Sequence, residues 1–431
     1  MKKLSTAPIS GMQELLPSEQ AVFNQLKSQI AETFRLHGFL SIETPTLERT
    51  EILCAKAGGD TEKQIYKVIK TTETAADADQ ALRFDHTVPL ARYVVEHQND
   101  LAFPFRVTQI GRNFRGERAQ KGRFREFYQC DVDIIGRGTL SIAYDAEIIA
   151  TLYTAIKSFL PATMKIRVSN RKILSGLLAD LGLASQADAI LSIIDHAEKV
   201  ESTQTHASLV ELGLNSRQIE ILENFMDIRG DRREVTVRLQ SLGIENAEFG
   251  AGVSELDQIL SILASQGITA IADMLIVRGL DYYTGTVFET FLVDYPKIGS
   301  ICSGGRYENL ASFYTDQQLP GVGGSIGLTR LFYVLNENNL LKSQIGNPVD
   351  IAVIPITESE YDFSFSLADK LRAIGRSADV VLLDKKLGDK LKYAAKIAQN
   401  AIVIGENEAK SGEAMVKNLT SGGLTPLSEL I

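Results

Sequence analysis

Residues 276–289 read Ile-Val-Arg-Gly-Leu-Asp-Tyr-Tyr-Thr-Gly-Thr-Val-Phe-Glu, and residues 300–307 read Ser-Ile-Cys-Ser-Gly-Gly-Arg-Tyr. The apolar and β-branched residues of both stretches predict strands, and the small residues predict tight turns beside them. An arginine, an aspartate and two tyrosines in the first stretch put charge and aromatic surface on this sheet, which favours a binding site. The alternative is a glycine-rich hairpin with an isolated ion pair, and either stretch alone leaves that alternative open.

The bulk composition predicts a multidomain protein. The chain has 431 residues, of which 44% are hydrophobic, and this exceeds the usual size of one core, so we expect two or three domains. Cys54, Cys130 and Cys302 show no CxxC spacing, which argues against a disulfide framework or a zinc site and fits a reducing compartment. Without an apolar leader or a run of about 18 apolar residues, we expect a cytoplasmic location and no membrane partner.

Charge is distributed unevenly along the chain. A formal net charge of -9 argues against nonspecific coating of nucleic acid, because such binding depends on neutralising phosphates. Between residues 111 and 125, however, one acid, Glu117, stands among six basic residues: Arg112, Arg115, Arg118, Lys121, Arg123 and Arg125. This run of basic residues is explained either by a phosphate-bearing ligand or by a solvated basic loop.

Apolar periodicity outlines a first domain interrupted by a helical module. We expect helices over 19–37 and 141–159, short strands over 39–43, 82–87 and 164–168, and mostly helical structure over 172–263. A strand-like, glycine-rich pattern resumes over 271–327. The predicted limits are 1–171 for the first part of this domain, 172–258 for the insertion and 259–340 for the second part.

A second domain is predicted after Gly346-Asn347-Pro348. Strand patterns alternate with helical ones there, with strands expected over 350–356, 380–383 and 401–404 and a helix over 358–374. We therefore expect a small α/β domain over 348–431.

Residues 114–129 have the pattern of a hairpin, with a basic loop between two strands. The chain lacks the GxxxxGK[ST] loop, so a protein that uses ATP must hold phosphate with side chains. Arg115 stands at the end of the incoming strand, where its planar guanidinium can hold the α-phosphate, and Glu117 can accept a hydrogen bond from the adenine amino group.

Polar residues alternate with apolar ones after this hairpin. Strand periodicity places Gln129, Asp131 and Asp133 on one face, which is unfavourable unless a partner or ligand is present. Asp85 occurs in a separate short run, Arg83-Phe84-Asp85-His86-Thr87. It either joins the polar face in recognising a substrate or forms a buried ion pair with Arg83.

A glycine-rich strand, residues 321–327, leads into an apolar helix that contains Arg330. Glycines permit close approach of backbones. This segment resembles motif 3 of class II aminoacyl-tRNA synthetases, and residues 114–129 resemble motif 2. Residues 276–289 and 300–307 resemble the two signature stretches of histidyl-tRNA synthetases. The resemblance covers nearly the whole chain and is weakest in the helical insertion.

The resemblance implies a fold: an α+β class II synthetase catalytic domain with an antiparallel sheet and a helical insertion, followed by a C-terminal α/β anticodon-binding domain. It also implies an activity, in which L-histidine and ATP form histidyl-adenylate and histidine is then transferred to tRNA(His). Pro45 falls where motif 1, a dimer-interface element, is expected, so a homodimer is implied. Mg²⁺ would accompany ATP, with ligands that the sequence does not assign.

By matching positions, the resemblance also implies site residues. Arg115 and Arg278 are the expected catalytic arginines, and ATP contacts are expected from Arg115, Glu117, Arg123 and Arg330. Histidine contacts are expected from Asp85, Thr87, Gln129, Asp133, Tyr282, Tyr283 and Tyr307. Contacts with tRNA are expected from Gln120 and Lys121 in the hairpin loop and from Lys385, Lys386 and Lys390 in the last domain. These last three belong to a lysine-rich segment that is equally typical of a solubilising helix.

Two residues depart from the family pattern. His86 stands where leucine or glycine is expected, and Thr329 stands where an acidic residue often precedes the motif 3 arginine. His86 is either packed in the core or alters substrate affinity. A rival interpretation is the regulatory subunit of ATP phosphoribosyltransferase, which shares the fold, but Arg115, Arg278 and Arg330 together favour the enzyme. A pure RNA-binding module would leave the amino-acid site unexplained.

Overall fold

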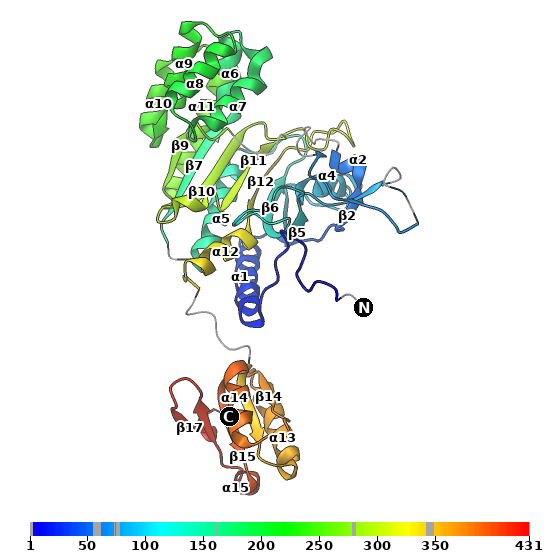
Figure 1. Cartoon of the computed structure of the whole chain (residues 1–431). Helices are drawn as coiled ribbons and strands as arrows, with labels where there is room; N and C mark the ends of the chain where they lie inside the picture. Colours follow the sequence, from blue (N-terminus) through cyan, green and yellow to red (C-terminus); the bar gives the residue numbers. More distant parts are fainter. Residues whose placement is uncertain are drawn as a thin grey trace. The chain divides into compact units, whose positions relative to one another are not determined.

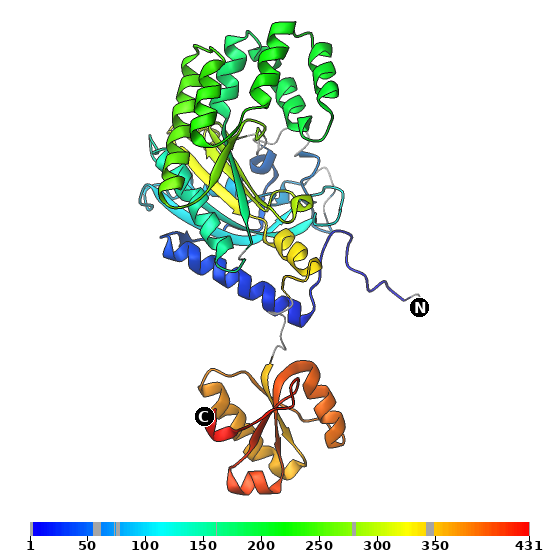
Figure 2. The same cartoon turned by 90° about the vertical axis from the view of Figure 1, so that its left-hand side faces the viewer.

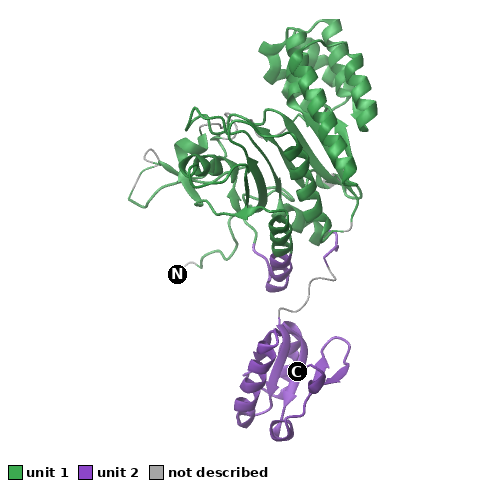
Figure 3. Cartoon of the chain, turned by 180° about the vertical axis from the view of Figure 1, so that it is seen from behind, with its two compact units in different colours: residues 1–13, 26–337 green, residues 14–25, 338–431 purple. Residues whose placement is uncertain are grey.

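The computed structural model describes residues 3–54, 62–72, 74, 78–160, 162–277, 282–341 and 349–430. The chain divides into two compact units, residues 1–13 with 26–337 and residues 14–25 with 338–431 (Figure 3). The large sheet and a small three-stranded sheet belong to unit 1, and the five-stranded sheet belongs to unit 2. The domain limits expected from the sequence stay predictions.

Unit 1 is built on one large mixed sheet (Figure 1). Its strands lie in the order β1-β5-β6-β12-β11-β10-β7-β9-β8, and every pair is antiparallel except β1–β5 and β7–β9. The strands are β1 (Leu40–Ser41), β5 (Phe105–Phe114), β6 (Glu126–Ile135), β7 (Met164–Asn170), β8 (Arg229–Gly230), β9 (Ala270–Asp273), β10 (Thr286–Leu292), β11 (Cys302–Tyr307) and β12 (Gly321–Ile326). The predicted hairpin thus exists as β5 and β6, ten residues each.

Adjacent glycines of β12 show what lies on the two faces of this sheet. A Cβ on Gly324 would come 2.6 Å from Leu152 of α5 (Ala143–Lys157), so that helix covers one face. A Cβ on Gly323 would come 1.9 Å from Asp133 Oδ1, on the opposite face. The polar residues of β6 therefore lie on the face that α5 leaves uncovered. Two further helices pack in this unit, the second half of α1 (Pro17–Leu36) and α12 (Leu328–Glu337), which contacts β6.

A small three-stranded sheet lies before β5 in the chain. Its order is β2-β4-β3, with β2 (Leu47–Arg49), β3 (Lys67–Val68) and β4 (Gln80–Leu82), and α2 (Thr50–Cys54) packs beside it. The predicted strand over 82–87 is wrong beyond Leu82. The chain turns instead, and α4 (Thr87–Glu96) begins at Thr87, because Val88, Leu90, Ala91 and Val94 have helical rather than alternating apolar spacing.

The predicted helical insertion consists of α6–α11, with one short strand, β8, and one short 3-10 segment between them. It forms a bundle at the end of the sheet where β9 lies (Figures 1 and 2). The helices are α6 (Arg171–Asp180), α7 (Ala187–Ala197), α8 (Ser202–Glu211), α9 (Ser216–Met226), α10 (Arg232–Ser241) and α11 (Ala247–Ser265). Because α11 continues to Ser265 and packs against α5, α6 and β7, the bundle and the sheet share one core.

A network of ion pairs also joins the insertion to the sheet. Arg167 of β7 donates from Nε to Asp273 of β9 over 2.8 Å, and its two terminal nitrogens contact Glu198, which follows α7. Asp273 is fully buried, so its carboxylate depends on this arginine for charge compensation.

Unit 2 contains the predicted α/β domain. Its sheet has the order β14-β13-β15-β16-β17, with parallel pairing around β13 and antiparallel pairing beyond β15. The strands are β13 (Val349–Pro355), β14 (Ala378–Val380), β15 (Ala398–Ile404), β16 (Met415–Asn418) and β17 (Leu424–Pro426), and the helices are α13 (Tyr361–Ala373), α14 (Leu387–Ile397) and α15 (Glu406–Ser411).

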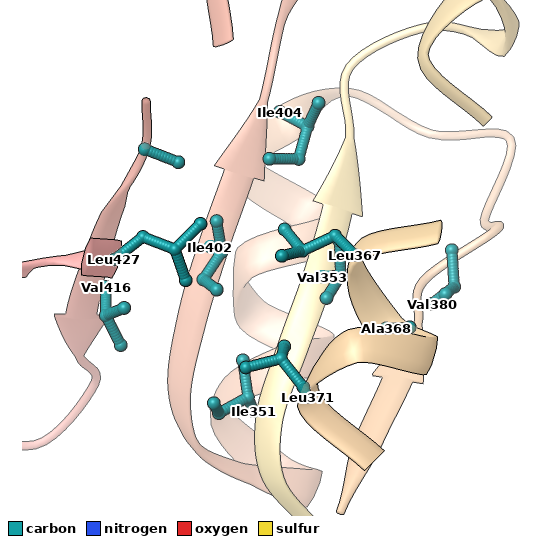
Figure 4. Packing of buried hydrophobic residues seen from close by; sticks show 11 residues of the cluster. Ile351, Val353, Leu367, Ala368, Leu371, Val380, Ile402, Ile404, Val416 and Leu427 are labelled. Carbon is teal, nitrogen blue, oxygen red and sulfur yellow. The ribbon is translucent and has the colours of Figure 1, made fainter. Parts of the chain in front are cut away.

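Alternation along β13 explains how this sheet is covered on both faces. Ile351 and Val353 pack with Leu367 and Leu371 of α13 (Figure 4), whereas Ala352 and Ile354 pack in a separate cluster with Ala394 of α14. These α/β layers confirm the fold class expected for the last domain. In the described parts of the chain, no helix is both long and apolar enough to cross a membrane.

Candidate functional site

Two cavities adjoin on the open face of the large sheet. The inner cavity, about 250 Å³, is lined by Asp85, Thr87, Gln129, Asp131, Asp133, Tyr282, Tyr283 and Tyr307, among others. The outer cavity, about 350 Å³, is lined by Glu117, Arg123, Phe124, Phe127 and Arg330, among others. Arg115, Gln129, Glu289, Ser303 and Ser325 line both and form a shared wall. The residues expected for histidine and for ATP thus fall into neighbouring cavities.

The alternation along β6 is confirmed. Gln129, Asp131 and Asp133 all line the inner cavity, while Cys130 and Val132 are fully buried on the other face. The side-chain nitrogen of Gln129 donates to Ser325 Oγ over 2.7 Å, and its oxygen accepts from Asn113 over 2.8 Å. This amide is therefore held between β5 and β12.

Asp133 lies at the inner end of this row of polar residues and pairs with Tyr307. The Tyr307 hydroxyl donates to Asp133 Oδ1 over 2.8 Å. Burial raises the pKa of Asp133 to about 8, with a further contribution from the nearby Asp131 charge, whereas the Tyr307 hydrogen bond opposes the shift. At neutral pH Asp133 is thus predominantly a neutral carboxylic acid, which can donate a hydrogen bond.

Three tyrosines form an aromatic wall beside Asp133. The ring centroids of Tyr282 and Tyr283 are 5.1 Å apart, and those of Tyr282 and Tyr307 are 5.9 Å apart, both in edge-to-face geometry. Such contacts favour a fixed arrangement of the rings. All three expected tyrosines therefore belong to one rigid side of the inner cavity.

Asp85 and Thr87 lie at the start of α4. Asp85 Oδ1 accepts a hydrogen bond from the Val88 main-chain nitrogen over 2.9 Å, and burial raises the pKa of this carboxyl group. The alternative ion pair with Arg83 is not seen, because that guanidinium donates to the carbonyl oxygens of Thr44 and Arg112. Asp85 is thus left to face the cavity.

Arg115 belongs to the shared wall and is held by stacking. Its guanidinium carbon lies 4.5 Å from the Phe84 ring centroid and 5.1 Å from that of Phe127, and Nε donates to the Phe84 carbonyl oxygen over 3.3 Å. A planar cation between two rings keeps its orientation while its edge remains free for an anion.

Arg330 of α12 also lines the outer cavity. It donates to the Ile298 carbonyl oxygen, and burial together with the nearby Arg123 charge lowers its pKa. In the same cavity, an Arg123 terminal nitrogen lies 3.4 Å from a Glu117 carboxylate oxygen.

Thr329 is one of the two departures from the family pattern. Its hydroxyl accepts a hydrogen bond from the Tyr128 main-chain nitrogen over 2.8 Å, which connects α12 to β6.

Gln120 and Lys121, expected to contact tRNA, are not among the residues that line these cavities. Gln120 and Lys121 are exposed in the hairpin loop, where a large partner can reach them. Arg278 lies outside the described residues. On either side of the segment 278–281, the carbonyl oxygens of Val277 and Tyr283 accept hydrogen bonds from Arg171, the first residue of α6, over 3.3 and 2.7 Å.

In unit 2, the expected lysines differ in environment. Lys385 and Lys386 are exposed and precede α14 rather than belonging to it. Lys390 is buried, and its ammonium group donates to the carbonyl oxygens of Pro355 and Ile356. The expected contact between Lys390 and tRNA is therefore corrected: this lysine is held inside the domain.

A separate cavity of about 830 Å³ in unit 2, lined by Phe363, Lys370 and Met415 among others, contains none of the expected site residues.

Some cavity residues were absent from the expected set. Asp131, Glu289, Ser303 and Ser325 line the inner cavity as well. The alternation of β6 had already placed Asp131 on the correct face. No local pattern marks Glu289 or Ser325, since they reach the cavity through the pairing of β10, β11 and β12.

Comparison with known proteins relates the whole chain to a single group. The family model described as "Histidyl-tRNA synthetase" matches residues 11–331, and that described as "Anticodon binding domain" matches residues 350–430. A protein of Clostridium tetani named "Histidine--tRNA ligase" is 46% identical, covering 99% of this chain and 98% of its own length.

Solved structures are similar as well. The histidyl-tRNA synthetase of Nostoc sp. PCC 7120 superimposes with a TM-score of 0.85 at 35% identity, covering 98% of this chain and 97% of its own. A Bacillus halodurans structure described as an ATP phosphoribosyltransferase regulatory subunit/histidyl-tRNA synthetase gives 0.77 at 23% identity, with 93% and 99% covered. The latter likeness shows the fold alone.

Proposed function

Because the chain belongs to the histidyl-tRNA synthetase family, we propose that it is a histidine–tRNA ligase, which joins L-histidine to tRNA(His) at the expense of ATP. The observation that carries this function is the pair of adjoining cavities with Arg115 in their shared wall. Two substrates held in such cavities meet at that wall. The carboxylate of histidine can then attack the α-phosphorus of ATP.

The inner cavity suits histidine. Since the carboxylate must reach the shared wall, the imidazole ring extends away from it toward Asp133 and Tyr307, which line only the inner cavity. A neutral Asp133, oriented by the Tyr307 hydroxyl, donates to a ring nitrogen. Asp85 and Thr87 receive the α-ammonium group, with Gln129 beside them, and the tyrosine rings enclose the substrate.

The outer cavity suits ATP. Arg115 holds the α-phosphate, Glu117 accepts from the adenine amino group, and Arg123 and Arg330 contact the remaining phosphates and the base. As the histidine carboxylate attacks, a bond from its oxygen to the α-phosphorus forms and the bond to pyrophosphate breaks. Arg115, and Arg278 by resemblance, stabilise the charge on the phosphoryl oxygens, so positioning and electrostatics dominate the rate.

Mg²⁺ is proposed as the metal that accompanies ATP. It requires few protein ligands, typically one or two carboxylates besides phosphate oxygens, and Glu289 in the shared wall supplies a carboxylate of this kind. Bound Mg²⁺ would offset the charge of the triphosphate.

The second step transfers histidine to tRNA. The terminal ribose hydroxyl of tRNA(His) attacks the adenylate carbonyl carbon, its proton passes to a phosphate oxygen of the adenylate, and AMP leaves. Gln120 and Lys121 are proposed to contact the acceptor end, and Lys385 and Lys386 the RNA backbone near the anticodon. A homodimer and a cytoplasmic location complete the proposal.

Amino-acid-dependent exchange between ATP and pyrophosphate tests this function. Purified protein should catalyse exchange with histidine and with no other amino acid, and Arg278→Ala should lose it. A folded protein that binds histidine without exchange would instead be a regulatory subunit of the ATP phosphoribosyltransferase type. The three arginines of the sequence and the anticodon-binding match disfavour that alternative.

A further inference from the structure

His86 and Asp131 form a buried pair beside the inner cavity. The exposed fractions of these residues are 1% and 4%, and His86 Nδ1 lies 2.9 Å from Asp131 Oδ2. The two residues come from different elements, the start of α4 and the middle of β6, and are 45 positions apart in the chain. His86 is also the residue that departs from the family pattern.

The His86 ring is enclosed on the side that faces away from Asp131. Nε2 of His86 is buried and has no hydrogen-bond partner in the described residues. A Cβ on Gly111 would lie 3.1 Å from that nitrogen and 2.5 Å from Arg83 Nη2, so the guanidinium occupies the same small space. On the other side of the ring, Nδ1 faces a carboxylate oxygen, which accepts hydrogen bonds, so Nδ1–H is the donor to Asp131 Oδ2.

Asp131 occupies the middle of the polar row on β6. On one side Gln129 belongs to the shared wall, where the substrate carboxylate reacts, and on the other Asp133 lies at the imidazole end. Alternate residues of a strand are about 7 Å apart, so Asp131 is level with the part of histidine between its carboxylate and its ring. That part carries the α-ammonium group.

One carboxylate oxygen of Asp131, Oδ2, is hydrogen-bonded to His86, and the other, Oδ1, is not. Oδ1 is buried without a hydrogen-bond partner in the described part of the chain, and Asp131 lines the inner cavity. A buried carboxylate with an unfilled acceptor position is unfavourable unless a ligand fills it. The α-ammonium has three N–H donors that point in different directions, so it can contact Asp131 Oδ1 in addition to Asp85 and Thr87.

We propose, building on the function above, that Asp131 is a second carboxylate for the α-ammonium group of histidine and that His86 is the positioning residue that orients it. The Nδ1–H donor fixes Oδ2, which leaves Oδ1 for the substrate.

Three variants of the full-length protein test this assignment. His86→Leu removes the donor at similar volume, His86→Asn restores an N–H at the position of Nδ1, and Asp131→Asn removes the charge while keeping the shape. The measurements are kcat and KM for histidine and for ATP in pyrophosphate exchange. Calorimetric titration adds the affinities for L-histidine and for imidazolepropionate, which lacks the α-ammonium group.

We expect His86→Leu and Asp131→Asn to raise KM for histidine by about tenfold to a hundredfold, the range for a lost hydrogen bond to a charged group. KM for ATP should stay within about twofold, His86→Asn should recover most of the histidine affinity, and imidazolepropionate should bind all variants alike. His37→Leu is the matched control: His37 is hydrogen-bonded to Thr151, away from both cavities, and its loss should leave KM for histidine unchanged.

The assignment is overturned if His86→Leu and His86→Asn shift KM for histidine equally, or if imidazolepropionate loses affinity by the same factor as histidine. A lowered Tm with unchanged KM would make the pair purely structural. Asp131→Asn keeps the test decisive should His86→Leu fail to fold. Because calorimetry reports histidine binding without catalysis, a protein that binds histidine but exchanges no pyrophosphate would refute the ligase activity while still deciding the role of Asp131.

Discussion

The Tyr307 hydroxyl reaches Asp133 across an intervening strand. Tyr307 belongs to β11 and Asp133 to β6, and β12 lies between them in the sheet. The hydrogen bond is possible because β12 carries Gly321 and Gly323 at this level, where a Cβ would come 2.3 Å from the Tyr307 ring and 1.9 Å from Asp133 Oδ1. The glycines of the motif 3 strand thus leave space for side chains of its two neighbours.

Gly323→Ala should therefore damage the inner cavity. The added methyl group must displace the Asp133 carboxyl group, and overpacking of this kind typically destabilises by about 1–3 kcal/mol. We expect KM for histidine to rise at least tenfold and Tm to fall. Gly250→Ala is the control, since Gly250 lies in helix α11 with open space around its Cβ and should gain about 0.5–1 kcal/mol. Equal effects of the two substitutions on KM would contradict this account.

Asp133 should make stability depend on pH. Its pKa is raised from an ordinary 3.8 to about 8. Between these values the folded protein keeps a proton that the unfolded chain has released, so the contribution of this group to stability is present below about pH 4 and is lost as pH rises through 8. Each pKa unit is worth about 1.4 kcal/mol, so relative to the unchanged protein Asp133→Asn should gain about 4 kcal/mol between pH 5 and pH 8.5.

Urea denaturation followed by circular dichroism at pH 5 and pH 8.5 measures this difference. Asp180→Asn, at the exposed end of α6, is the matched control. A difference between Asp133→Asn and the unchanged protein that does not vary with pH would refute the raised pKa.

Arg115 should be irreplaceable by lysine. Lysine keeps the charge but has neither the planar stacking between Phe84 and Phe127 nor the paired donors. Both Arg115→Lys and Arg115→Gln should lower kcat for pyrophosphate exchange by about a hundredfold or more. Full activity of the lysine variant would show that only the charge matters.

Arg167 should be essential for attachment of the insertion to the sheet. Arg167→Met leaves Asp273 buried without its charge partner, and such losses cost about 3–5 kcal/mol. Thermal unfolding should show a marked fall in Tm, and limited proteolysis should cut faster within the insertion. The exposed pair Arg232–Asp257 offers the comparison, and Arg232→Met should change Tm far less. The prediction fails if the two variants unfold at similar temperatures.

Lys385 and Lys386 should contribute to RNA affinity and Lys390 to stability. The double variant Lys385→Ala/Lys386→Ala should weaken tRNA binding and reduce the salt dependence by about one to two released ions, because both side chains are exposed. Lys390→Met should lower Tm, since two carbonyl oxygens lose their donor. Filter binding over a series of salt concentrations measures the tRNA affinity and its salt dependence, and thermal unfolding measures Tm. An unchanged slope in the double variant would exclude backbone contact by these lysines.

Local patterns predicted those parts of the site that depend on neighbours in sequence. The alternation of Gln129 and Asp133, the β5–β6 hairpin and the glycine-rich strand all follow from spacing within a few residues, and each exists in the structure. The predicted strand over 82–87 is wrong beyond Leu82. Residues 82–87 are too few to reveal a helical period that begins only at Thr87.

Pairings between distant segments could not be predicted. Arg306 and Asp145 form a fully buried ion pair 161 residues apart, between β11 and α5, and nothing near either residue indicates the other. Lys390 illustrates the same limit, since a lysine-rich helix predicts exposure for every lysine, whereas the carbonyl oxygens that hold Lys390 come from the end of β13.

The two main-chain hydrogen bonds of Arg171 have a mechanical consequence. This residue opens the first helix of the insertion, yet its guanidinium is bonded to the backbone of Tyr283 in the histidine cavity and to that of Val277. One guanidinium thus anchors the main chain of the inner cavity to the start of α6, so the insertion and the aromatic wall share a point of attachment, which replacement of Arg171 would remove.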